Sequence, residues 1–181
     1  METIDNLREL FRYNDWANRR VAVSLKQAHR TLLDKQTKSA GQTKTAEEHG
    51  NKQACIEKAI GIFAHILTTE VEYFERLHGK DSTGMNFWPK LELEDCSELT
   101  RMTAEYYEKV LRRFEEEGLD IRVKYRTSAG MQKVNTIREM LYHVLMHSAT
   151  HRGNIVNLLR SGDCEPPVID YIIYLRETKY L

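Results

Sequence analysis

The sequence lacks a charge excess of either sign. Its 181 residues include 27 Lys and Arg against 27 Asp and Glu, so the formal net charge is zero. Domains that bind nucleic acid usually carry a basic excess, which this chain does not have. Its longest apolar runs, such as residues 59–64, are far shorter than the about 18 residues of a membrane span. We therefore expect neither a nucleic-acid nor a membrane partner.

Cysteine, proline and glycine are also scarce. The three cysteines, Cys55, Cys96 and Cys164, form no CxxC pair, which disfavours a secreted disulfide scaffold and suits a reducing compartment. The first five residues contain acids and no apolar core, so they do not resemble a secretory signal. We expect a cytoplasmic protein. Three prolines and nine glycines leave room for long, uninterrupted helices.

Four long segments have apolar residues at every third or fourth position, which predicts helices over about 3–29, 53–77, 97–117 and 136–160. Residues 120–127 and 131–135 alternate instead, which predicts a small hairpin. Two prolines at 166–167 precede a short last helix over about 168–177. The expected fold is an all-α four-helix bundle, with the hairpin before the fourth long helix and a short C-terminal helix.

The segment 34–54 interrupts this pattern, because it is polar, contains two glycines and has no large apolar side chain. We expect a polar loop insertion there, serving either as a passive connection or as a lid. The length of the chain predicts one domain, so residues 1–181 should form a single helical bundle domain that carries this insertion.

Three histidines in the fourth helical segment, His143, His147 and His151, follow one another at steps of four residues and so lie on one ridge. Met140 and Val144 share that side, which places the ridge toward the interior. A buried imidazole needs partners for both ring nitrogens, and a metal ion can satisfy one of them. His143 and His151 are about 12 Å apart along the helix, so a single ion would use either 143/147 or 147/151.

A third ligand would have to come from another helix. His65 lies in the second helical segment, off its main apolar stripe and beside Gly61, Ala64, Thr68 and Glu72. The small Gly61 and Ala64 would leave room for a site, but a half-exposed His65 fits the periodicity equally well. His29, His49 and His78 look like surface or loop residues, and we assign them no role.

Four stretches resemble the DinB-like family of four-helix-bundle metalloproteins. They are Tyr13-Asn14-Asp15-Trp16-Ala17-Asn18; His65 with Thr69-Glu70 and Arg76-Leu77-His78-Gly79; His143-Val144, His147 and His151-Arg152-Gly153; and Pro166 with Asp170 and Tyr174-Leu175-Arg176. The third stretch is the most specific of the four. Asn154 stands where the family often has Gln.

The resemblance implies one divalent metal ion per chain, with His65, His147 and His151 as ligands and water or substrate completing an open site. His143 would then be a pocket residue near the metal. The family includes transferases and isomerases that use low-molecular-weight thiols, and metal-dependent hydrolases, and it often forms homodimers. We expect zinc or nickel, with iron or manganese as alternatives, because all of them accept nitrogen ligands.

The sequence thus favours a metal-dependent enzyme of the thiol-S-transferase or hydrolase type, acting on a small molecule through an open site of three histidines. The alternatives are a non-catalytic metal-binding or sensor protein, and a structural dimerisation domain. Further pocket candidates are Asn14, Trp16 and Glu72, with core packing the simpler role for Trp16. The basic positions 122, 124 and 126 would form either an anion-binding edge or a solvated strand face.

Apolar residues beyond a single stripe predict a homodimer. They are Ile62 and Ile66 in the second helical segment and Tyr107 and Leu111 in the third. If one stripe of each helix fills the bundle, these residues leave apolar surface for a second copy of the chain.

Overall fold

The computed structural model describes residues 4–38 and 45–179. Its elements are α1 (Ile4–Lys38), α2 (Thr45–Leu77), α3 (Leu93–Glu117), β1 (Arg122–Arg126), β2 (Gln132–Thr136), α4 (Ile137–Ser161) and α5 (Tyr171–Lys179). The two strands pair antiparallel in a hairpin. The described part of the chain is therefore mostly helical, which confirms the all-α bundle with a hairpin before the last long helix.

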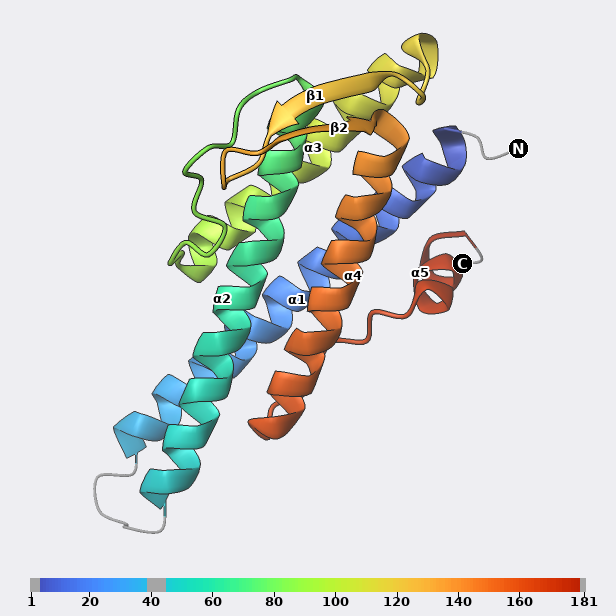
Figure 1. The fold of residues 1–181 in the computed structure, drawn as a ribbon. Helices are drawn as coiled ribbons and strands as arrows, with labels where there is room; N and C mark the ends of the chain where they lie inside the picture. The colour runs from blue at the N-terminus through green and yellow to red at the C-terminus, as the bar shows by residue number, and fades with distance from the viewer. Residues whose placement is uncertain (1–3, 39–44, 180–181) are drawn as a thin grey trace.

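Figure 1 shows α2 and α4 side by side, with α1 and α3 behind them and the hairpin across one end of the bundle. The contacts agree, since α2 packs most extensively against α4, and α1 against α3. The short α5 packs against α1. The longest interface in the fold is thus the one between the two helices that carry the predicted ligands.

Hydrogen bonds at the start of α4 connect that helix directly to the hairpin. Thr136 ends β2 and also caps α4, because its hydroxyl accepts a hydrogen bond from the backbone N–H of Glu139 while the Glu139 carboxylate accepts one from Thr136 N–H. This reciprocal arrangement fixes where a helix begins. A similar arrangement of Glu92 and Asp95 starts α3 at Leu93, four residues before the predicted start.

Two apolar clusters make up the core. One joins the second half of α1 with the middle of α2, the start of α3 and the end of α4. The other joins the start of α1 with the end of α2, α3, the hairpin and the start of α4. Buried polar residues lie near the boundary of the two clusters, at positions 14 and 18 of α1, 65 and 68–70 of α2, and 148 and 152 of α4. The polar layer in the middle of the bundle is where the candidate site is found.

The predicted loop over 34–54 needs correction, because α1 continues to Lys38 and α2 already begins at Thr45. Both helices therefore extend into this segment, and residues 39–44 lie outside the described residues. The prediction relied on the loss of apolar periodicity. Lys, Gln, Glu and Ala are nevertheless good helix formers without any apolar stripe, so a polar segment can continue a helix.

The apolar residues behind the dimer prediction are buried within the chain itself. Ile62, Ile66, Tyr107 and Leu111 all belong to the core. The reason is that α2 contacts α1, α3 and α4 together, so more than one stripe of it is covered. These four residues offer no surface to a second copy. No helix in the described ranges is both long and apolar enough to cross a membrane.

Candidate metal centre

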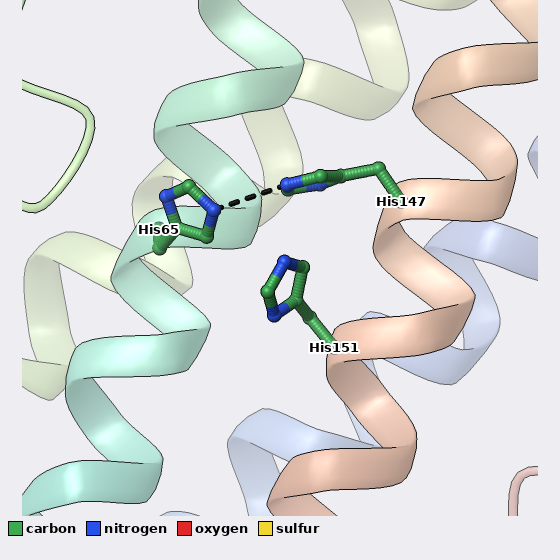
Figure 2. Close-up of side chains that lie close together, drawn as sticks. All are labelled: His65, His147 and His151. Atoms are coloured by element: carbon green, nitrogen blue, oxygen red, sulfur yellow. Dashed lines mark hydrogen bonds between the residues drawn. The ribbon is translucent and has the colours of Figure 1, made fainter.

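Three histidine side chains from α2 and α4 meet in the middle of the bundle. Figure 2 shows His65 from α2 facing His147 and His151, which are one turn apart on α4. One ring nitrogen of each lies within 4.8 Å of the others, and the Nε2 atoms of His65 and His147 are 3.0 Å apart. His65 is buried, and the other two are half-buried. The triad is therefore positioned for metal binding.

The connection between α2 and α3 sets the proton position and orientation of His65. Its Nδ1 atom lies 2.7 Å from the backbone carbonyl oxygen of Phe87, which can only accept a hydrogen bond. Nδ1 therefore carries the proton, and Nε2 presents its lone pair to His147. The indole ring of Trp88 stacks on His65, with the ring centroids 3.8 Å apart and the planes at 4°. A hydrogen bond to the outer nitrogen is the support that a ligating histidine usually has.

The surroundings keep the two histidines of α4 neutral. Burial is the largest cause that lowers the pKa of His147, to about 3, and the nearby imidazoles lower it further. Burial and His65 also lower the pKa of His151. Because a metal ion binds the unprotonated imidazole, the triad offers its lone pairs at neutral pH.

One pair of donor atoms already has the separation that a divalent transition metal needs. Two nitrogen ligands about 2.0–2.1 Å from one zinc ion lie about 2.9–3.4 Å apart, and the separation of 3.0 Å between the Nε2 atoms of His65 and His147 falls in that range. Among the described residues, the group contains no fourth His, Cys, Asp or Glu. The Nδ1 atoms of His147 and His151 are buried and accept or donate no hydrogen bond within the described ranges. The triad could thus hold an ion while leaving coordination positions open.

Behind the triad lies a buried polar network that connects α1, α2 and α4. Oε1 of Glu70 accepts hydrogen bonds from the amides of Asn14 and Asn18, at 2.8 and 3.0 Å, and from the hydroxyl of Ser148 at 2.9 Å. The guanidinium of Arg152 donates to the side-chain oxygens of the same two asparagines, at 2.6 and 2.9 Å. Two asparagines of α1 therefore bridge a buried carboxylate of α2 to a buried guanidinium of α4.

The network and the triad use neighbouring positions on the same helices. Ser148 and Arg152 directly follow His147 and His151, and successive helical residues point about 100° apart. Glu70 and Arg152 are each 1% exposed, so neither charge reaches water. Because the bridge ties α4 to α2 through α1, it sets the rotation of α4 that turns His147 and His151 toward His65.

The structure places the other predicted pocket residues outside the triad. His143 stacks on Tyr73, with centroids 4.6 Å apart, and its ring centroid is 5.7 Å from that of His147. Burial and the cation of Arg76 lower the pKa of His143. Glu72 is buried and pairs with Arg76 at 3.5 Å.

Asn14 and Trp16 have structural roles in α1. Asn14 belongs to the buried network described above. The indole of Trp16 donates to Glu177 at 3.2 Å and packs edge-on against Tyr174, so it holds α5 against α1. The basic side chains of β1 are exposed, and Arg126 lies 3.7 Å from Asp81, which is the arrangement of a solvated strand face.

Sequence reasoning missed Phe87 and Trp88 as parts of the site. A backbone carbonyl carries no sequence signal, and an aromatic residue in a connection has no periodicity to indicate what it faces. Ser148 had a signal, because it directly follows one of the predicted ligands. Asn18, Glu70 and Arg152 stood in the motifs that carry the family resemblance.

Comparison with known proteins identifies the family of the chain. The model of the DinB family matches residues 1–180. This chain belongs to the DinB family. It is 25% identical over 179 residues to protein DinB of Bacillus subtilis strain 168, and the match covers 94% of each chain. No solved structure matches the chain. Members of the DinB family therefore provide the sequence context, while the arrangement of the triad comes from the structure described here.

Proposed function

We propose that this member of the DinB family is a metal-dependent enzyme that acts on a small molecule, with His65, His147 and His151 as the metal ligands. The observation that carries the proposal is the convergence of three imidazoles with no fourth ligand side chain in the described part of the chain. Structural zinc sites in proteins are closed by four protein ligands, whereas catalytic sites keep a position for water or substrate.

A divalent ion in such a site lowers the pKa of a bound water or thiol and polarises a carbonyl group. The chain's own residues supply the rest. Phe87 holds the proton of His65 away from the donor atoms, and Trp88 covers one face of that ring. His143, kept neutral by its surroundings, stands at the edge of the triad where it would accept a proton.

Two reaction classes fit a site of three histidines. The triad contains no cysteine among the described residues, so a reactive sulfur would come from a low-molecular-weight thiol cosubstrate in a thiol-S-transferase. A hydrolase would use water in its place. Zinc and nickel are the expected ions, since nitrogen donors without thiolate or carboxylate suit both, and iron or manganese would also be accepted.

Elemental analysis of protein purified without added metal is the first test. We expect about one divalent ion per chain, and turnover of thiol-transfer or ester substrates that disappears on chelation and returns with the ion. Stoichiometric metal without turnover on any substrate would favour a metal-binding or sensor protein. Protein that takes up no ion even on titration would leave the triad as a structural feature.

The homodimer stays a prediction from the family resemblance, because the residues first chosen for the interface are buried. Light scattering at micromolar concentration should give twice the 21.2 kDa mass of the chain. A particle of the monomer mass would refute the dimer without affecting the metal site.

A further inference from the structure

Next to the triad lies a groove of about 580 Å³, built by the second half of α1, the first half of α2 and the segment 88–92. A volume of about 300–1,000 Å³ is typical of sites that bind small molecules. Leu32, Ile60 and Leu91 provide apolar side chains, and the polar side chains that line the groove are those of His29, Gln53, Glu57, Lys90 and Glu92. Sequence analysis gave His29 no role, so this surface is a new feature of the molecule.

Two of the residues that line the groove lie beside His65 of the triad. Trp88 lines the groove and stacks on His65, and its ring centroid is 6.2 Å from that of His151. Gly61 lines the groove one helical turn before His65. A molecule with one end at the triad can therefore lay its other end against Trp88 and along α2.

We propose that this groove binds the uncharged, apolar body of the substrate, aliphatic or aromatic, while the reactive group is held at the histidine triad. The inference rests on the proposed function, because it assumes an ion at the triad. The groove follows α2 from Gln53 to Gly61, a length of about 12 Å at 1.5 Å per residue. The carboxylates of Glu57 and Glu92 and the ammonium of Lys90 line it, so it has no excess of positive charge for an anion, and its aliphatic and tryptophan side chains suit an apolar body.

Gly61 gives a direct way to fill the groove. No heavy atom lies within 4 Å of the position that its Cβ would occupy, so a larger side chain meets open space. Gly61→Leu would place an isobutyl group in the groove without straining the helix. Gly153 in α4 is the matched control, because it is also helical, is exposed, and has no atom within 4 Å of the added Cβ.

The probes are acetohydroxamate and octanohydroxamate, which share a metal-binding head and differ in the apolar tail. Their dissociation constants are measured by calorimetry on zinc-loaded protein. We expect the longer probe to bind at least about tenfold tighter, because its tail is buried in the groove. Gly61→Leu should remove most of this difference while zinc content and the affinity for acetohydroxamate stay unchanged. Gly153→Leu should keep the difference in full.

Equal affinity for the two probes in the unchanged protein would overturn the proposal, and so would a tail effect that survives Gly61→Leu. Should that variant not fold, Leu91→Ala serves instead, since Leu91 lines the groove and has no part in the triad. The tail effect should then shrink, with binding of acetohydroxamate as the check on the site.

Octanamide, which has the tail without the metal-binding head, separates this proposal from the proposed function. It should bind weakly to metal-free protein and not to Gly61→Leu. If both hydroxamates fail to bind but octanamide binds in this pattern, the groove is correct and the open metal site is wrong. If acetohydroxamate binds and octanamide does not, the metal site stands and the groove proposal fails.

Discussion

The histidine triad and the buried network behind it are built from the same stretches of α2 and α4, yet they are opposites in their hydrogen bonding. In the network, Glu70 and Arg152 are fully buried and are connected through two asparagines. In the triad, ring nitrogens of His147 and His151 converge beside His65, and their outer nitrogens have no partner among the described residues. The two charges of the network meet partners inside the protein, and among the described residues only Nε of Arg152 has none, whereas the triad needs a partner from outside.

The difference shows how a small helical bundle can keep reactive groups in place. A buried charge without its partner is costly, so the network holds only one arrangement of α1, α2 and α4. Because Ser148 and Arg152 directly follow the histidines, that arrangement also orients the triad. The network thus stabilises the packing of the helices, and the triad provides the groups that can bind an ion.

The largest expected effect is on metal binding in His151→Ala. We expect loss of the ion and of all metal-dependent activity, because two imidazoles from different helices are left to hold it. The chain should stay helical, and its stability should fall by at most a few kcal/mol (~1–4), mainly through the lost ion. Circular dichroism and metal content decide the matter. Outright unfolding would make the site structural and remove the main support for an enzyme.

The second effect is on stability in Arg152→Met, which leaves the Glu70 carboxylate buried without its cation. The free energy of unfolding in urea should fall by about 3–5 kcal/mol. Arg113→Met is the control, since Arg113 forms an exposed ion pair with Glu117 at 3.0 Å, and it should cost less than about 1 kcal/mol. Similar losses in the two variants would mean that the network does not hold the helices.

A double variant tests whether Glu70 and Arg152 stabilise the fold as a pair. The double variant Glu70→Leu with Arg152→Met should be less destabilised than the sum of the single variants, because no unpaired charge is left. Additive losses would contradict the bridge through Asn14 and Asn18.

A third effect concerns the stability of the metal-free protein below neutral pH. The folded-state pKa of His147 is lowered to about 3, against about 6.5 when unfolded, so the unfolded chain binds the extra proton. This histidine therefore contributes nothing to pH dependence above about pH 6.5 and lowers stability as the pH falls below it. His147→Gln should show a shallower decline between pH 6.5 and 5 in urea titrations. An unchanged slope would mean that His147 takes up its proton normally in the folded protein.

The smallest effect is expected in His143→Ala. This variant should keep one ion per chain with an affinity weakened by no more than about tenfold, since His143 lies beside the triad rather than in it. Activity should be altered if His143 handles a proton. Loss of the ion in His143→Ala together with its retention in His151→Ala would show that 143/147 is the ligand pair.

The sequence predicted those features of the fold and the site that depend on the local spacing of residues. Steps of four residues placed His147 and His151 on one ridge, and alternation located the hairpin. Periodicity could not decide whether His65 faced the interior, because that depends on how α2 rotates against α4. It also failed at 34–54, where helix propensity continues both helices without an apolar stripe.

The bridge between Glu70 and Arg152 was beyond any local pattern. Its members are far apart in sequence, and only the packing of three helices shows that they meet. Trp88 illustrates the same limit, since nothing in its neighbours along the chain indicates that it stacks on His65.

The hydrogen bond from His65 to the Phe87 carbonyl has a consequence for how this family can evolve. Because the acceptor is a backbone atom, replacing the side chain at position 87 leaves it in place, and selection on that residue's identity would be weak. An insertion or deletion between Leu77 and Phe87 would instead move the carbonyl away from the imidazole. The contact constrains the length of the connection. Homologous chains that keep this hydrogen bond would therefore keep the number of residues between α2 and α3, while the identities of those residues change.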